Sequence, residues 1–273
     1  MMVPLTLSEL EQTAKEIRKD VLRMIYQAGS GHPGGSLSSV EILVALYFGG
    51  VLKFDHHRGG EEKDHFILSC GHVCPAWYAV LARTGVFNEQ LLETLREFGS
   101  PLQGHPSLVH AGFVETSSGS LGQGLAVGAG KALAMKINKE KGKVVVLCSD
   151  GELDEGSVWE TVMWAGFKQL DNLNLVIDRN QMQIGGRTEK VLDLEPLQEK
   201  FRSFGWEAYQ CDGHDFGELL ANFCNFNEQK RRPKVVICRT VRGKGISFME
   251  NSEKYHAGTL SEEEYQKAIE ELE

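Results

Sequence analysis

Residues 144–186 read VVVLCSDGELDEGSVWETVMWAGFKQLDNLNLVIDRNQMQIGG and contain the order strand, helix, strand. The apolar, mostly β-branched run 144–148 is typical of a buried parallel strand, and residues 173–177 are typical of its neighbour. Helical spacing fills the segment between them, residues 155–170. A unit of this kind places the carboxyl ends of both strands at one edge of the sheet, where open α/β sheets bind ligands.

Polar residues follow both strands at that edge. Asp150 comes directly after the first strand, and Asn180 follows the second. A magnesium ion that bridges a diphosphate needs protein oxygens in near-octahedral geometry, and here Asp150 would supply a charged oxygen and Asn180 a neutral one. A backbone carbonyl near Met182 could complete the set, while Gly151 permits close approach of the backbone to a phosphate. The alternative is that Asp150 caps a helix and Asn180 lies in a turn.

The pair Asp150-Gly151, followed thirty residues later by Asn180, is similar to the thiamine diphosphate motif, and the chain around it resembles transketolase. Further segments resemble cofactor and substrate loops of that family and occur in the family's order: GSGHPGG (29–35), SCGH (69–72), GHP (104–106), GSLGQG (119–124), RT (239–240) with GKG (243–245), and YH (255–256). A full transketolase continues with a pyrimidine-binding domain and a C-terminal domain. The chain therefore resembles the separately encoded N-terminal half of a split transketolase.

Four histidines match histidines of the family. By this resemblance His32 contacts the hydroxyls of the sugar phosphate, and His72 lies near the diphosphate and the thiazolium. His105 would face the substrate channel, and His256 would contact both diphosphate and substrate. Neutral imidazoles can donate or accept protons with sugar hydroxyls near pH 7, so these four are candidate catalytic residues. The alternative, for His105 above all, is a solvated loop histidine.

The resemblance also implies which residues hold the cofactors. Contacts to thiamine diphosphate would come from Ser30, His72, Gly119, Ser120, Leu121, Gly151, Glu152, Asn180 and His256. The cation, which is Mg²⁺ or in its place Ca²⁺ or Mn²⁺, would be bound by Asp150, Asn180 and Met182. Ser120 stands where many bacterial members have proline, and Ser149 stands where most members have glycine. Glu155 matches a glutamate at the family's dimer interface and joins the candidate catalytic residues, because it would connect two cofactor sites.

The activity implied by the resemblance is transfer of a two-carbon ketol unit from a ketose phosphate to an aldose phosphate, as in the pentose phosphate pathway. In the family, a glutamate of the pyrimidine-binding domain hydrogen-bonds the aminopyrimidine ring. We therefore expect the partner to be a separate C-terminal transketolase subunit, with two copies of each chain in a symmetric heterotetramer. The alternatives are the diphosphate-binding subunit of another thiamine-dependent ketol or acyl transferase, and a scaffold that keeps the fold without catalysis.

Strand and helix patterns alternate through the rest of the chain. Further strands are expected at residues 66–69, 206–209 and 235–238. Helices are expected at residues 7–27, 36–48, 125–137, 194–203, 215–226 and 261–271, from Pro75 and from Asn88. No repeat or linker-like tract interrupts this pattern. We therefore expect one α/β domain over residues 1–273, doubly wound, with a mainly parallel sheet and helices on both faces.

Composition argues against several classes of partner. A net charge of −9, with dispersed Lys and Arg, argues against nucleic acid. No segment reaches the roughly eighteen apolar residues of a membrane span. The N-terminus opens with the helix-start pattern TLSELE (6–11) and not with a signal peptide, so we expect a cytoplasmic protein without membrane contact. The six cysteines form no CxxC pair, as is typical of reduced thiols.

Overall fold

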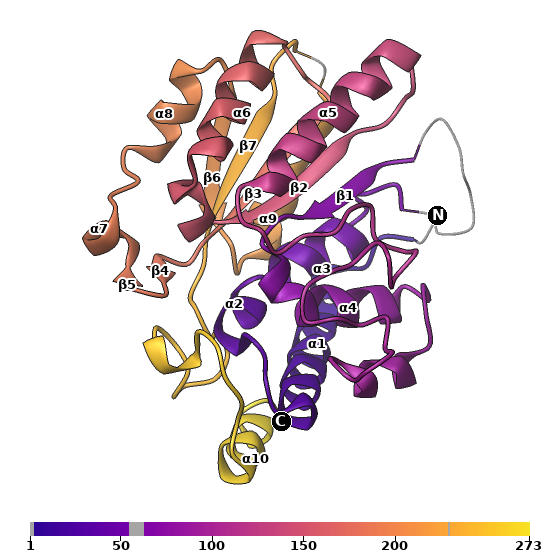
Figure 1. Ribbon diagram of the computed structural model, residues 1–273, viewed down its shortest axis with the longest axis vertical. Helices are drawn as coiled ribbons and strands as arrows, with labels where there is room; N and C mark the ends of the chain where they lie inside the picture. The colour runs from indigo at the N-terminus through magenta and orange to yellow at the C-terminus, as the bar shows by residue number, and fades with distance from the viewer. Residues whose placement is uncertain (1–2, 55–62, 229) are drawn as a thin grey trace.

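The computed structural model describes residues 3–54, 63–228 and 230–273. Its centre is a parallel sheet of five strands in the order β1-β2-β3-β7-β6, which lies between layers of helices in Figure 1. The strands are β1 (His65–Leu68), β2 (Val144–Ser149), β3 (Leu173–Arg179), β6 (Glu207–Asp212) and β7 (Lys234–Arg239). The expected α/β fold with a parallel sheet is thereby confirmed.

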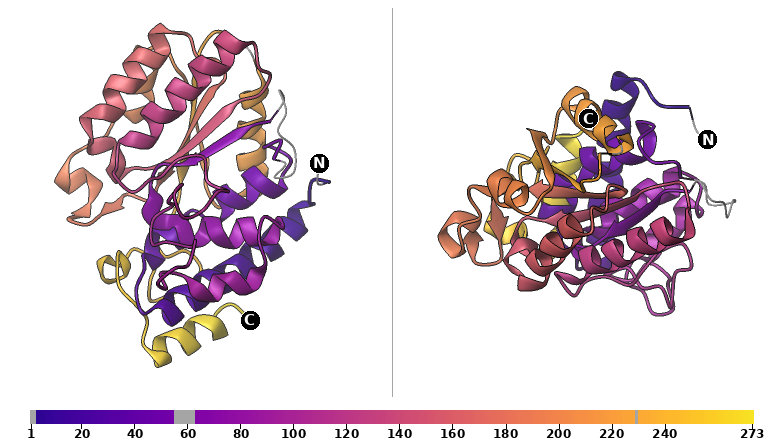
Figure 2. Two further views of the ribbon diagram at one scale, coloured as in Figure 1. Left: turned by 45° about the vertical axis from the view of Figure 1, so that its right-hand side comes forward. Right: turned by 90° about the horizontal axis from the view of Figure 1, so that it is seen from above.

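Helices cover both faces of this sheet, as the two views of Figure 2 show. One face packs against α5 (Gln123–Asn138), α6 (Gly156–Phe167) and α8 (Leu197–Ser203). The other face packs against α3 (Val40–Phe48) and α9 (Phe216–Phe223), with α1 (Leu7–Ala28) and α4 (Cys74–Arg83) against α3. The short α2 (Pro33–Ser38) and the last helix α10 (Glu262–Glu270) pack on α1.

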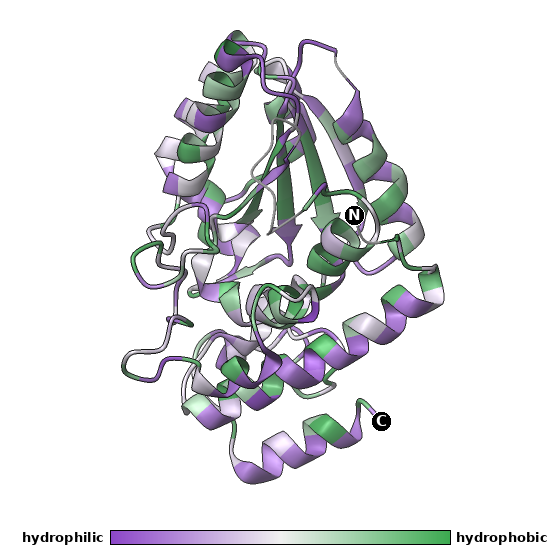
Figure 3. Cartoon of the chain, turned by 90° about the vertical axis from the view of Figure 1, so that its right-hand side faces the viewer, coloured by the Kyte–Doolittle hydropathy of each residue, from purple (hydrophilic) through white to green (hydrophobic). Residues whose placement is uncertain are grey.

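The apolar run of β2 is explained by burial on both faces. Val145 and Leu147 enter the core on the side of α3, whereas Val144 and Val146 enter the core on the side of α5. Successive side chains of a strand point to opposite faces, so a strand covered on both sides must be apolar throughout. Figure 3 shows the strands in green at the centre of the molecule.

Two expected helices differ from the structure. Residues 36–48 form two helices instead of one, because the chain bends at Ser39 between α2 and α3, and α2 already begins at Pro33. The segment after Asn88 forms a 3₁₀-helix, η2 (Glu89–Thr94), instead of an α-helix. Gly99 and Pro101 follow it closely and leave little room for further helical turns, and short 3₁₀ pieces are typical of such connections.

A short antiparallel hairpin follows β3 and was not expected from the sequence. It consists of β4 (Met182–Gln183) and β5 (Gly186–Arg187), and it leads into α7 (Thr188–Val191). The remaining 3₁₀ turns are η1 (Gly71–Val73), η3 (Gly151–Asp154), η4 (Cys224–Asn227) and η5 (Glu253–Tyr255). The helix start expected at Thr6 is confirmed by a capping box with Glu9. Over the ranges that the structure describes, no helix has both the length and the apolar character needed to cross a membrane.

Candidate cofactor site

A cavity of about 240 Å³ lies where β2 and β3 end. The sequence-predicted residues on its wall are His32, His72, His105, Gly119, Leu121, Gly151, Asn180, Met182 and His256. The wall is completed by Gly35, Ser149, Gln183, Ile184 and Arg242. A larger hollow of about 730 Å³ beside the ends of β6 and β7 has none of the predicted residues on its wall, so the smaller cavity is the candidate site.

The four predicted histidines come from separate segments and meet around His32. The ring centroid of His32 lies 5.2 Å from that of His72, 5.7 Å from that of His256 and 6.1 Å from that of His105. The Nδ1 atoms of His32 and His256 are buried and have no hydrogen-bond partner among the described residues. Buried polar atoms are nearly always paired, so these two atoms are suited to a ligand in the cavity.

Burial lowers the pKa of the central imidazoles. The pKa of His72 falls to about 3 and that of His32 to about 4, with burial as the main cause in both. Neighbouring positive charges add to this effect, from Arg242 in both cases and from Arg96 at His32. The pKa of His105 is lowered for the same reasons, burial first and Arg96 second. The imidazoles are therefore neutral at pH 7 and able to accept or donate a hydrogen bond.

We expect His32 and His72 to stay neutral when the pH falls from 7 to about 5, because the charged form of a buried imidazole is disfavoured. Long-range ¹H–¹⁵N correlation NMR of the ring nitrogens measures this directly. The control is the same chain in urea, where both rings should titrate near the ordinary histidine pKa of about 6.5. A midpoint at or above that value in the folded chain would contradict the burial of these rings.

Asp150 and Asn180 occupy neighbouring positions beyond the ends of β2 and β3. The Asp150 side chain is fully buried; its Oδ1 accepts the Gly151 N–H (2.8 Å) and its Oδ2 accepts the Gln181 N–H (2.6 Å). Burial raises the pKa of Asp150 to about 7, with Asp178 adding to the shift. The Asn180 Oδ1 accepts the Met182 N–H (3.1 Å). A divalent cation beside Oδ1 of Asp150 would relieve the cost of burying this carboxylate.

The donor set here fits a cation that a diphosphate shares. Among the described residues, no group of three or more His, Cys, Asp or Glu side chains could hold a metal ion. A cation at this edge would therefore depend on one carboxylate, one amide oxygen and a backbone carbonyl, with the remaining oxygens from a ligand. Mg²⁺ is usually bound in this way, through one or two carboxylates and substrate phosphates.

Two arginines at the site were missed from the sequence. Arg242 is 2% exposed and makes no ion pair within the described residues, and its Nε and Nη1 atoms have no hydrogen-bond partner there. Burial lowers the Arg242 pKa, but an arginine stays charged in proteins. A buried, unpaired cation on a cavity wall indicates an anionic ligand. A Cβ on Gly34 would lie 2.9 Å from Nε of Arg242, so glycine is required there. The second, Arg96, is exposed and donates to Ser30 Oγ (3.4 Å).

Glu152 supports the loop 119–124, which was predicted to contact thiamine. The Glu152 side chain is fully buried, and its Oε1 accepts the Gly122 N–H (2.8 Å) and the Ser69 hydroxyl (2.5 Å). Glu152 is not on the cavity wall, and its contact with the cofactor stays a prediction. Gly119 has a φ of +125°, and a Cβ there would lie 2.7 Å from the His105 ring.

Four other predicted residues are not on the cavity wall: the buried Asp150, and Ser30, Ser120 and Glu155. Ser30 accepts a hydrogen bond from Arg96, and Ser120 is exposed next to Leu121. Glu155 is exposed at the start of α6 and makes no side-chain hydrogen bond within the described ranges. Its placement gives no direct route to a ligand in the cavity.

Comparisons with known proteins agree with this geometry. The family described as "Transketolase, thiamine diphosphate binding domain" matches residues 10–272. The chain is 37% identical to one of the subunits of an apulose-4-phosphate transketolase from Phocaeicola vulgatus, over 96% of this chain and 93% of that protein. It is 40% identical to "6-deoxy-6-sulfo-D-fructose transketolase subunit SqwG" of a Clostridium species, over 97% and 96%.

Among solved structures, transketolase from Campylobacter jejuni superposes with a TM-score of 0.90 at 30% identity. That match covers 98% of this chain but 43% of the Campylobacter chain, which is much longer. The family match over residues 10–272 includes Asp150, between β2 and η3, and Asn180, directly after β3. The chain belongs to the transketolase family and comprises its thiamine diphosphate-binding region.

Proposed function

We propose that this chain is the N-terminal subunit of a thiamine diphosphate-dependent transketolase that moves a two-carbon ketol unit from a ketose phosphate to an aldose phosphate. The observation that carries the proposal is the cavity wall, where four imidazoles, the unpaired Arg242 and the Asn180 amide face one space beside Asp150. In this proposal residues 1–273 form a single diphosphate-binding domain. Ketol transfer that requires thiamine diphosphate, a divalent cation and both subunits is the test.

The residues divide into two groups around the cavity. Asp150, Asn180 and the Met182 carbonyl would hold Mg²⁺, and Arg242 would pair with the diphosphate. Gly119, Leu121 and Gly151 would let the cofactor approach the backbone. When bound, thiamine diphosphate supplies the carbon nucleophile and the electron sink.

The histidines would manage protons and orient the sugar. Because burial keeps His32 and His72 neutral, each can accept a proton from a sugar hydroxyl or donate a hydrogen bond to it. The rings of His105 and His256 lie next to the ring of His32, with centroid distances of 6.1 and 5.7 Å, and they would complete a polar wall along the sugar chain. Two relatives are named for sugars with a phosphate and a sulfo group. We therefore propose as donor a ketose that bears an anionic group.

A partner subunit is supported by what the cavity wall lacks. None of the described residues on the wall is an aspartate or glutamate, so no carboxylate there could hydrogen-bond an aminopyrimidine ring. The relatives named as single subunits match this chain along nearly their full length. A second polypeptide would supply that carboxylate and close the cavity.

Assembly of two copies of each chain is supported by exposed apolar side chains on α5 and α6. These side chains are Val127, Ile137, Met163, Trp164 and Phe167, with exposures between 36% and 78%. Contiguous exposed apolar groups on a soluble protein usually mark an interface. The two helices pack against each other, so a second copy could cover both.

Glu155→Gln is expected to weaken this assembly more than it weakens metal binding, because the Glu155 side chain is exposed at the start of α6 and is not on the cavity wall. Sedimentation velocity measures the assembly, and calorimetry measures the cation. Glu160 is the matched control, since it is an exposed glutamate of the same helix about 140° further round. If Glu155→Gln and Glu160→Gln both behave as wild type, Glu155 only interacts with the helix dipole.

A further inference from the structure

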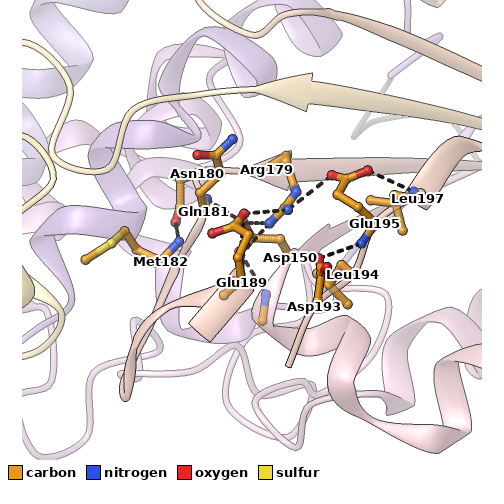
Figure 4. A network of polar contacts seen from close by, with 12 residues as sticks. Asp150, Arg179, Asn180, Gln181, Met182, Glu189, Asp193, Leu194, Glu195 and Leu197 are labelled. Atoms are coloured by element: carbon orange, nitrogen blue, oxygen red, sulfur yellow. Dashed lines mark hydrogen bonds and ion pairs between the residues drawn. The ribbon is translucent and has the colours of Figure 1, made fainter. Parts of the chain in front are cut away.

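Arg179 is a buried cation at the end of β3 that no part of the proposed function uses. Its side chain is 3% exposed, and its guanidinium makes four contacts; Figure 4 labels the partners Asp150, Glu189 and Glu195. Nη1 donates to Asp150 Oδ2 (3.1 Å) and to Thr188 Oγ1 (2.7 Å). Nη2 donates to Glu189 Oε1 (2.9 Å) and Glu195 Oε1 (3.2 Å). One side chain thus joins the proposed metal ligand to the segment that follows the β4–β5 hairpin.

The contacts on Asp150 differ between its two oxygens. Among the described residues, Oδ2 accepts from both the Arg179 guanidinium and the Gln181 N–H, whereas Oδ1 accepts only from the Gly151 N–H. An ionised carboxylate offers about two acceptor positions on each oxygen. Oδ2 is therefore fully used, and Oδ1 keeps one position free. A cation can be bound only through Oδ1, with the carboxylate plane already fixed.

The other end of Arg179 is held by carboxylates that are partly open to solvent. The side chains of Glu189 and Glu195 are 36% and 56% exposed. Glu195 is itself fixed at the start of α8, because its Oε2 accepts the Leu197 N–H (3.0 Å). The segment between Arg179 and these glutamates includes Met182, whose carbonyl is the third proposed ligand. Arg179 therefore fixes both the carboxylate and the backbone that surround the proposed cation.

Repulsion between Arg179 and a nearby cation is the opposing effect. It is offset, because the guanidinium contacts three carboxylates, those of Asp150, Glu189 and Glu195, and one positive charge faces three negative ones. Orientation of the ligand should then outweigh repulsion. We propose that Arg179 is the positioning residue of the metal site. It orients the Asp150 carboxylate so that only Oδ1 binds the cation, and it links Asp150 to the segment 182–195.

This inference rests on the proposed function, and Mn²⁺ binding to the full chain with saturating thiamine diphosphate tests both. The concentration of free Mn²⁺ is measured by electron paramagnetic resonance. Residues that orient a metal ligand typically contribute about 10–100-fold to metal affinity, so Arg179→Met should weaken Mn²⁺ binding by about that factor. Arg179→Lys keeps the positive charge but loses the planar guanidinium that contacts several acceptors at once. Its loss of Mn²⁺ affinity should therefore be intermediate.

The matched control is Arg202→Met, which removes an arginine that pairs with Glu199 on the exposed side of α8. It should bind Mn²⁺ as wild type does. If Arg179→Met fails to fold, the double variant Glu189→Gln/Glu195→Gln replaces it, because that variant keeps the Asp150–Arg179 pair. It should show a smaller loss of Mn²⁺ affinity, with Glu199→Gln as its control. A purely structural role would lower the melting temperature without changing Mn²⁺ affinity.

The outcomes separate the two claims. If the wild-type chain binds Mn²⁺ and the Arg179 variants bind it equally well or more tightly, the positioning role is overturned and the proposed metal site stands. Absence of thiamine diphosphate-dependent Mn²⁺ binding by the wild-type chain would remove the metal site and the inference together. A graded loss from wild type through Arg179→Lys to Arg179→Met supports both.

Discussion

Asp150→Ala is expected to abolish magnesium-dependent binding of thiamine diphosphate. Asp150 is the carboxylate that directly follows β2, between the wall residues Ser149 and Gly151, and the other proposed ligands are neutral. Changing a residue that merely orients a metal ligand typically costs about 10–100-fold in affinity, so removing the charged ligand should cost more. The diphosphate would then face the Arg242 cation without the bridging ion. Titration calorimetry with Mg²⁺ and thiamine diphosphate measures the loss.

The fold should survive this substitution. Asp150 is buried with a pKa raised to about 7, so in the metal-free chain its carboxylate is costly to keep charged. Its partner Arg179 keeps Glu189 and Glu195 after the change. Asp171→Ala is the matched control. Asp171 lies just before β3, at the edge of the sheet opposite to Asp150, and pairs with Lys136. Wild-type affinity in a folded Asp150→Ala chain would rule out the metal assignment.

The parts of the site that could be predicted from the sequence are those that strand topology controls. Asp150 and Asn180 lie together because parallel strands end at one edge of a sheet, and β2 and β3 are neighbours in register. The four histidines also meet as the resemblance implied, although their segments are far apart in the chain. Both predictions depend on chain order and not on side-chain contacts.

The parts that could not be predicted depend on long-range contacts of charged side chains. Arg242 and Arg179 look like ordinary polar residues in the sequence. Only the fold shows that Arg242 is buried without an ion pair to any described residue and that Arg179 is buried among carboxylates. The Glu152 side chain turned away from the cavity because it satisfies the Gly122 N–H. The β4–β5 hairpin has two residues in each strand, too few for a periodic pattern to reveal.

The isolated chain is expected to show no robust ketol transfer, and activity should appear only when a second polypeptide supplies the pyrimidine-binding and C-terminal domains. The reason is chemical. The described wall of the cavity carries imidazoles, two amides and an arginine but no carboxylate, so the aminopyrimidine ring would find no carboxylic acid or carboxylate on this wall. Positioned proton transfer typically contributes about 10²–10⁴-fold to a rate, and the isolated chain should fall short by at least that factor.

A coupled assay with a ketose phosphate donor and an aldose phosphate acceptor tests this dependence. The chain, a partner of roughly 300 residues, a length typical of two domains, and their mixture are compared at equal cofactor concentration. The mixture with Asp150→Ala controls for activity of the partner alone, because it leaves the exposed faces of α5 and α6 unchanged but removes the proposed metal ligand. Turnover should rise with partner concentration and level off at one partner per chain. Comparable turnover by the homogeneous isolated chain would refute the split-enzyme proposal, because the proton transfer would then arise from residues already on this cavity wall.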